Sequence, residues 1–89
     1  MNGMRLQEEA NLLYVLVDAA DDAGRLNGEN AARWREAKHR FCHHDQSAGA
    51  LLYLLLDSLD YSGAIRHTWI QARWSTVKAR ISAGAGVLR

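Results

Sequence analysis

The chain has 89 residues, of which 48% are hydrophobic and 24% are charged, and its net charge at pH 7 is +1. These values are typical of one small globular domain with a thin core, and they exclude a disordered chain. Proline is absent. Because alanine, leucine and arginine are plentiful while β-branched residues are few, the composition favours helix throughout.

Cysteine content and the length of the apolar runs bear on the cellular compartment. The single cysteine, Cys42, excludes an intrachain disulfide and favours a reducing compartment. Glu8 and Glu9 stand where a signal peptide carries basic residues. The apolar runs at 12–17 and 51–56 are six residues long, whereas a membrane-spanning helix needs about 20. We therefore expect a soluble, cytoplasmic protein that makes no membrane contact.

The first half of the chain predicts two helices. Apolar residues at spacings of three or four predict a helix over about 6–23, which is apolar on most sides. Gly24 follows it and can adopt the left-handed conformation that ends a helix. A second helix takes Asn27 or Asn30 as its N-cap and ends near His43, where imidazoles suit the negative end of the helix dipole.

The second half predicts two more helices. Asp45 or Ser47 is the N-cap of a helix over about 46–62, which Gly63 ends. A fourth helix over about 64–83 ends at Gly84 and leaves a loose tail. The inner stripe of this helix is apolar and consists of Ile70, Trp74, Val77 and Ile81.

The two halves repeat one another. The segment LLYVLVDAADDAG at 12–24 recurs as LLYLLLDSLDYSG at 51–63, with seven of thirteen positions identical. With one residue inserted, the repeat continues into the second and fourth helices, where ARW at 32–34 recurs at 72–74. The repeating unit is therefore a helical hairpin with a period of 39 to 40 residues.

A single hairpin of this kind cannot cover its own apolar face, whereas two stacked hairpins can. We therefore predict an all-α, single-domain protein: a four-helix bundle made of two tandem helical hairpins with pseudo-twofold symmetry. The hairpins span about 6–44 and 45–84, and a short flexible tail follows at 85–89.

Paired acids and repeated arginines are the charged features of the repeat. Asp18 and its repeat equivalent Asp57 face Arg33 and Arg73 if each hairpin is antiparallel, which predicts two ion pairs. The alternative is that the acid pairs at i, i+3, Asp18 with Asp21 and Asp57 with Asp60, serve metal or acid–base chemistry, for which the sequence supplies no substrate pocket.

The C-terminal segment is basic, since 64–89 holds five bases and no acid. Arg66, Arg73 and Arg80 recur every seven residues and predict one basic stripe on the helix. A phosphate backbone fits such a stripe, and a solvated basic face is the alternative interpretation.

A histidine and cysteine cluster ends the second helix. His39, Cys42 and His43 lie at i, i+3 and i+4, a spacing that can hold zinc. A metal site needs a fourth ligand, for which the sequence offers Asp45, His44 or His67, so these residues are weak metal candidates. The alternative is that the histidines act as helix-end cations and the cysteine is merely packed.

The aromatic residues divide into core and surface. Trp34 and Trp74 are repeat equivalents on inward stripes and are predicted to be core, and Tyr14 and Tyr53 are also equivalent. Trp69 has no repeat partner, which makes it the candidate interface anchor. A four-helix bundle also leaves part of the first and third helices uncovered, and that surface consists of Leu12, Tyr14, Val15, Leu51, Tyr53 and Leu54.

Uncovered apolar surface predicts a protein–protein interaction module, not an enzyme, with no cofactor. The partner is another protein, on which the chain acts as a regulator or inhibitor, or a second copy in a homodimer. The alternative function is nucleic-acid binding through the basic face of the fourth helix. The candidate partner-binding residues are Trp69, Tyr14, Tyr53, Arg66, Arg73 and Arg80.

Overall fold

The structure is a computed structural model that describes residues 9–87, with side chains described as far as residue 83. Within this range the chain forms four α-helices and no strand. The helices are α2 (Ala10–Asp22), α3 (Glu29–Cys42), α4 (Ser47–Ser62) and α5 (Trp69–Val87). The all-α prediction is confirmed. None of these helices is long and apolar enough to cross a membrane.

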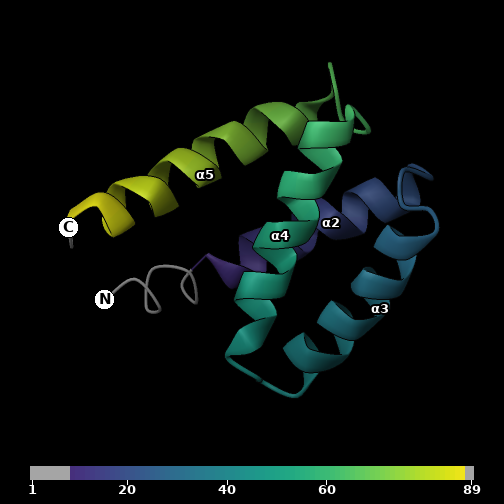
Figure 1. Cartoon of the computed structure of the whole chain (residues 1–89), viewed down its shortest axis with the longest axis horizontal. Helices are drawn as coiled ribbons and strands as arrows, with labels where there is room; N and C mark the ends of the chain where they lie inside the picture. Colours follow the sequence, from purple (N-terminus) through teal and green to yellow (C-terminus); the bar gives the residue numbers. More distant parts are fainter. Residues whose placement is uncertain (1–8, 88–89) are drawn as a thin grey trace.

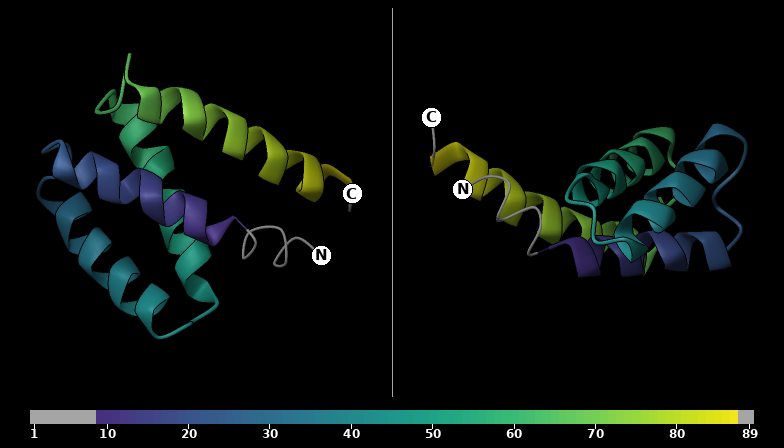
Figure 2. Two further views of the ribbon diagram at one scale, coloured as in Figure 1. Left: turned by 180° about the vertical axis from the view of Figure 1, so that it is seen from behind. Right: turned by 90° about the horizontal axis from the view of Figure 1, so that it is seen from below.

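The helices form a flat array in which α4 crosses α2 at the centre (Figures 1 and 2). The principal extents are 36 × 30 × 17 Å, so the array is thin in the direction in which α2 and α4 are stacked. α3 packs more closely on α4 than on α2, and α5 packs more closely on α2 than on α4. α3 therefore packs mainly on the second half of the chain, and α5 packs mainly on the first half.

The core lies between the two central helices, where apolar residues recur at spacings of three or four. α2 buries Leu13, Leu16, Val17 and Ala20. α4 buries the equivalent residues Leu52, Leu55, Leu56 and Leu59. The flanking segments add Leu26, Trp34, Ala37, Ile65, Ile70, Trp74 and Val77.

Glycine ends both central helices, as the sequence predicts. Gly24 and Gly63 have φ angles of 73° and 81°, which lie in the left-handed region. After each glycine, a backbone N–H returns to the helix, from Arg25 to the Ala20 carbonyl and from Ala64 to the Leu59 carbonyl, both at 2.9 Å. This 6→1 bond is that of a Schellman motif, and it satisfies a carbonyl at the helix end.

The start of α5 corrects the sequence analysis, which placed it near residue 64. Residues 64–68 form a turn in which His67 has a φ of 63°, and this conformation interrupts the helix. Thr68 then caps α5, because its Oγ1 accepts a bond from the Gln71 N–H at 3.3 Å. The Gln71 Oε1 accepts from the His67 N–H at 3.0 Å. Arg66 therefore lies in the turn, outside the helix.

The end of α5 differs too. The helix continues through Gly84 to Val87, because glycine permits a left-handed turn without requiring one. Residues 85–87 of the predicted tail are therefore helical, and 88–89 lie outside the described residues. The predicted start of the first helix near residue 6 also lies outside them.

The N-caps of the middle helices are partly as predicted. Asp45 caps α4, since its Oδ1 accepts a bond from the Ser47 N–H at 2.9 Å. Neither Asn27 nor Asn30 caps α3. Gly28 precedes that helix with a φ of 55° and no side-chain cap.

Candidate functional site

Aromatic side chains fill the wedge between the two helices of each half. Tyr14 of α2 lies 5.0 Å from Trp34 of α3, between ring centroids, and Tyr53 of α4 lies 5.0 Å from Trp74 of α5. Both tryptophans are buried, as predicted, with 3% and 0% of their surface exposed. The two tyrosines are half-buried and pack against these tryptophans, so their rings are part of the core packing.

A lysine covers each buried tryptophan. Lys38 Nζ lies 5.0 Å from the centroid of the Trp34 ring, and Lys78 Nζ lies 5.7 Å from that of Trp74. The ammonium groups face the electron-rich rings, which is a favourable cation–π arrangement. Each indole Nε1 is buried and has no hydrogen-bond partner among the described residues. Burial also raises the pKa of Tyr14, and the nearby Cys42 and Asp18 add to the effect.

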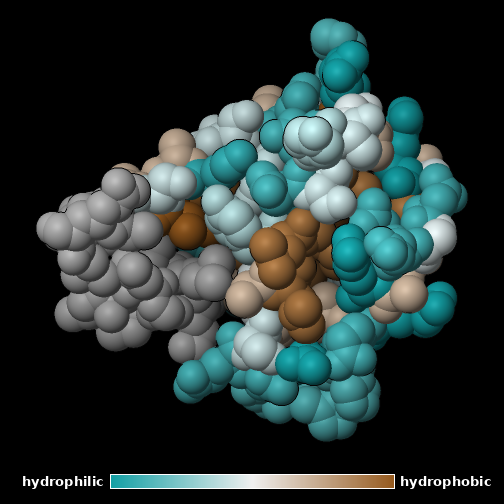
Figure 3. Space-filling view, in the orientation of Figure 1, coloured by the Kyte–Doolittle hydropathy of each residue, from teal (hydrophilic) through white to brown (hydrophobic). Residues whose placement is uncertain are grey.

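The outward face of α4 carries exposed apolar side chains. We call Ala50, Leu54, Asp57 and Tyr61 the α4 ridge, since they lie at i, i+4, i+7 and i+11 along one side of the helix. Leu54 is 61% exposed and Tyr61 is 94% exposed. Figure 3 shows the apolar surface as a continuous area over α4 in the middle of this face. Contiguous exposed apolar surface is a common feature of interaction sites.

A shallow hollow of about 290 Å³ adjoins the α4 ridge, between α4 and α5. We call it the α4–α5 hollow. Its lining surface is apolar and comes from Ala50, Tyr53, Leu54 and Ile81. The candidate residue Tyr53 therefore contributes to this surface from its half-buried position.

The repeat provides an internal comparison for the α4 ridge. The equivalent residues on α2, which we call the α2 ridge, are Asn11, Val15, Asp18 and Asp22, and all are exposed. Val15 is 53% exposed, close to the value for Leu54. The two ridges have similar exposure but differ at two of their four positions: Asn11 corresponds to Ala50, and Asp22 corresponds to Tyr61. The other two positions are alike, since Val15 matches Leu54 and Asp18 matches Asp57.

The ion pairs of the acids differ from the prediction. Asp57 pairs with Lys78 at 3.2 Å, where the sequence analysis expected Arg73. Hydrogen bonding to Asp57 raises the pKa of Lys78. Arg33 pairs with Glu29 of its own helix at 3.2 Å instead of with Asp18. The reason is that α3 packs more closely on α4 than on α2, and Asp18 has no ion-pair partner among the described side chains.

The structure divides the predicted basic stripe. Arg80 pairs with Glu9 at 2.7 Å, and Arg66 lies in the turn before the helix. Arg66 and Arg73 are exposed and form no ion pair with any side chain in residues 9–83. Arg73 shares a shallow hollow with Trp69, which is 61% exposed. Of the basic candidates, these two arginines are the ones that lie open to a ligand.

In the histidine and cysteine cluster, the two histidines contact each other. The His39 and His43 rings are 4.3 Å apart, and the His43 Nδ1–H donates to the His39 carbonyl at 2.8 Å. Cys42 is exposed. No group of three or more metal-binding side chains occurs within the part of the chain that the structure describes.

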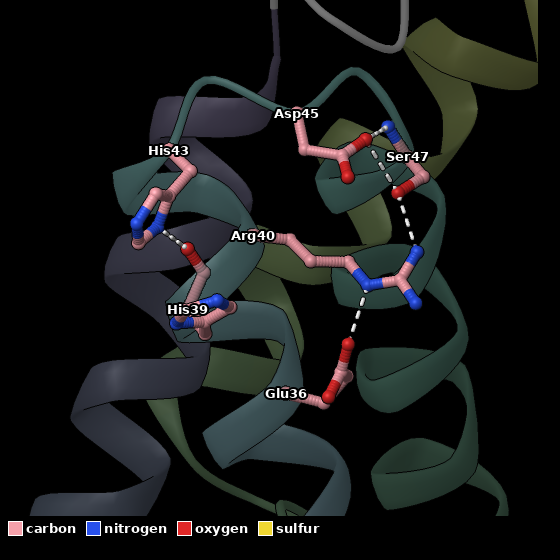
Figure 4. A network of polar contacts seen from close by, with 6 residues as sticks. All are labelled: Glu36, His39, Arg40, His43, Asp45 and Ser47. Carbon is pink, nitrogen blue, oxygen red and sulfur yellow. Dashed lines mark hydrogen bonds and ion pairs between the residues drawn. The ribbon is translucent and has the colours of Figure 1, made fainter.

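A polar network joins the end of α3 to the start of α4 (Figure 4). Arg40 Nε donates to Glu36 at 2.6 Å, and Arg40 Nη1 donates to Ser47 Oγ at 2.8 Å. Ser47 Oγ in turn donates to Asp45 Oδ1 at 2.7 Å. The bonds from Ser47 hold the pKa of Asp45 below its usual value, and the nearby Arg40 adds to this.

Sequence reasoning named Leu54 among the uncovered apolar residues but missed Tyr61. The signal was present in the repeat, because Tyr61 stands where the first copy has Asp22. Comparison of the chain with models of protein families, curated protein sequences and solved structures finds no match. Function is therefore inferred from the geometry of the chain itself.

Proposed function

We propose that this chain is a small, non-enzymatic protein–protein interaction module and that the α4 ridge is its binding surface. The observation that carries this proposal is the contrast between the two ridges. The α4 ridge exposes Leu54 and Tyr61 where the equivalent positions of α2 carry Val15 and Asp22. Burial of a leucine side chain contributes roughly 1.5–3 kcal/mol, so the exposed ridge has free energy to gain from a partner.

We also propose that the fold is a tandem repeat of two hairpins with pseudo-twofold symmetry. The tyrosine, tryptophan and lysine contacts recur in both halves at equivalent positions. Arg40 bonds to the start of α4, and its equivalent Arg80 bonds to Glu9 at the start of α2. In such an array α2 and α4 present similar ridges on opposite faces. The α4 ridge exposes Tyr61 where the α2 ridge has Asp22, so we assign the interaction to α4.

A cytoplasmic location is part of the proposal. Its support is the exposed free thiol of Cys42, which suits a reducing compartment.

A photo-reactive amino acid in the protein as expressed in its own cells tests the binding surface. Placed at position 54, it should form a covalent adduct with a second polypeptide. The matched control is position 15, which has the same place in the repeat and similar exposure. Adducts from position 15 alone, or from neither position, would refute the α4 ridge as the binding surface.

Nucleic-acid binding is the second candidate function, and one observation favours it. Arg66 and Arg73 lack ion pairs among the described side chains, and the exposed indole of Trp69 lies beside Arg73. Exposed aromatic rings next to arginines suit stacked bases and phosphates. Two of the basic groups of α5, Lys78 and Arg80, are already paired with acids, which reduces the positive charge available to phosphates.

Fluorescence anisotropy with labelled single-stranded and duplex oligonucleotides tests this candidate. Binding through these arginines should weaken steeply with salt and be lost in Arg73→Glu. The repeat-equivalent Arg33→Glu is the control, because Arg33 is also exposed but lies on α3. No anisotropy change at low salt would exclude the candidate.

A further inference from the structure

The α4 ridge carries both a protrusion and a recess. Tyr61 projects from one end of the helix with 94% of its surface exposed. The α4–α5 hollow lies at the other end, next to Ala50. Eleven residues of α-helix separate Tyr61 from Ala50, which corresponds to about 16 Å along the helix axis. A surface with a protrusion and a recess on one straight line can be complementary to itself.

We propose that the partner of the α4 ridge is the α4 ridge of a second copy of this chain, packed antiparallel about a twofold axis. Tyr61 of each copy then enters the α4–α5 hollow of the other. This inference rests on the proposed function and names its partner. With the axis between Leu55 and Leu56, Ala50 faces the partner's Tyr61 and Leu54 faces the partner's Asp57. The same contact occurs twice, as an isologous interface requires.

The charges of the α4 ridge permit this pairing. Asp57 is the ridge's one ionisable group at neutral pH, and Lys78 of the same chain neutralises it at 3.2 Å. The α2 ridge could not pair with itself in this way. Its two acids, Asp18 and Asp22, form no ion pair with the described side chains, and two copies would bring four carboxylates together. Like charges of this kind oppose association.

The size of the contact sets the expected affinity. A helix of 16 residues is about 24 Å long, and a strip about 10 Å wide along it offers a few hundred Å² per copy. A standard stable interface buries about 800 Å² per partner, so this dimer belongs to the small, reversible class. We therefore expect a dissociation constant in the micromolar range. The mass of the protein in solution has to be measured at protein concentrations of about 1–500 µM.

Sedimentation equilibrium of the purified full chain tests the dimer directly. The wild-type mass should rise from that of one chain toward that of two across the concentration range. Leu54→Glu should remain a monomer throughout, because it places two charges in the apolar contact. Val15→Glu, the matched change on the α2 ridge, should dimerise like the wild type. A wild type that stays monomeric, or equal loss of dimer in both variants, would overturn the proposal.

A cross-linking experiment tests the antiparallel register. In a Cys42→Ser background, Ala50→Cys and Tyr61→Cys proteins are mixed and treated with a short bifunctional maleimide. The 50-to-61 link should dominate in the mixture. Links chiefly between two copies of the Tyr61→Cys protein would indicate parallel helices and overturn the antiparallel arrangement. Circular dichroism of each variant shows that it retains the helical content of the wild type.

The dimer and the broader function can fail separately. If the photo-reactive group at position 54 captures a different protein and the wild type is monomeric, the interaction surface stands and the self-association is wrong. If it captures a second copy, both stand. If it captures nothing in cells and the wild type is monomeric, both are wrong.

Discussion

One residue in the turn before α5 carries backbone strain. His67 has a φ of 63°, whereas the positive-φ residue in the turn before α3 is Gly28, with a φ of 55° and a ψ of −122°. A left-handed conformation costs a residue with a Cβ atom about 1–2 kcal/mol, whereas glycine adopts it freely. The second half of the chain therefore carries a histidine at a position that favours glycine.

Replacement of this histidine should stabilise the fold. We expect His67→Gly to raise the free energy of unfolding by about 0.5–1 kcal/mol, since the relief of strain exceeds the added entropy of the unfolded chain. Gly28→Ala should lower it by about 1–3 kcal/mol, because a φ of 55° with a ψ of −122° is a conformation that glycine adopts and residues with a Cβ atom avoid. Urea denaturation measures both. A loss of stability in His67→Gly would show that the imidazole itself holds the turn.

Asp45 makes the stability of the fold depend on pH. The bonds from Ser47 hold its pKa below the usual value in the folded state. A lowered folded-state pKa stabilises the fold fully above the unfolded pKa of about 3.9, and this contribution is lost as pH falls through the folded-state pKa. As the pH falls below about 4, the urea concentration at the midpoint of denaturation should therefore decrease less in Asp45→Asn than in the wild type.

Ser47→Ala provides the intermediate case for this pH dependence. It removes the hydroxyl bond to Asp45 and keeps the backbone N–H bond. Its loss of stability in acid should lie between those of the wild type and Asp45→Asn. Identical acid profiles for all three proteins would show that another group controls the response.

At the scale of the elements, the start of α5 depends on one cap. The Thr68 hydroxyl accepts from the Gln71 N–H, and the Gln71 amide also donates to Asp60 Oδ1 at 3.1 Å, which ties α5 to the end of α4. We expect Thr68→Ala to lower the free energy of unfolding by about 1 kcal/mol. Thr76→Ala makes the same change at an exposed position inside α5 and should cost less than about 0.5 kcal/mol. Equal costs would mean that the cap does not stabilise the helix.

The elements also show what sequence patterns can and cannot predict. Gly24 and Gly63 marked helix ends correctly, because each follows an apolar run and adopts the left-handed conformation. The start of α5 was missed because Ala64 and Ile65 continue the apolar pattern across a turn. The spacing of Thr68 and Gln71 is that of a capping box and was available as a signal. The strained conformation of His67 was not, since it depends on its surroundings.

Tertiary arrangement explains the ion pairs that the sequence predicted wrongly. Pairing Asp18 with Arg33 assumed that α2 and α3 lie flat against one another. Instead the two helices diverge around Tyr14 and Trp34, and Arg33 pairs with Glu29 in the next turn of its own helix. The contrast between the two ridges was readable from the repeat, but the exposure of Tyr61 became evident only from the packing.

At the scale of the whole molecule, the main contacts cross between the halves of the chain. α4 packs on both α2 and α3, and α5 packs on α2. Arg40 and Arg80 also bond across the boundary, to Ser47 and Glu9. A hairpin of either half thus leaves its apolar face open when it is alone, although the sequence pattern predicts the hairpin as the repeating unit. Folding should therefore require both halves together.

Two peptides test this dependence. A cut between His43 and His44 gives pieces 1–43 and 44–89, and it keeps the Asp45 cap with Ser47. Each piece alone should be largely unfolded, because isolated short helices are marginal in water and neither piece can bury its core residues. Mixed in equal amounts, the pieces should recover most of the helical signal of the intact chain in circular dichroism. The signal should depend on concentration, since association replaces an intrachain contact. Helical signal in either piece alone, unchanged on mixing, would show that each hairpin folds independently and that the contacts between the halves are secondary.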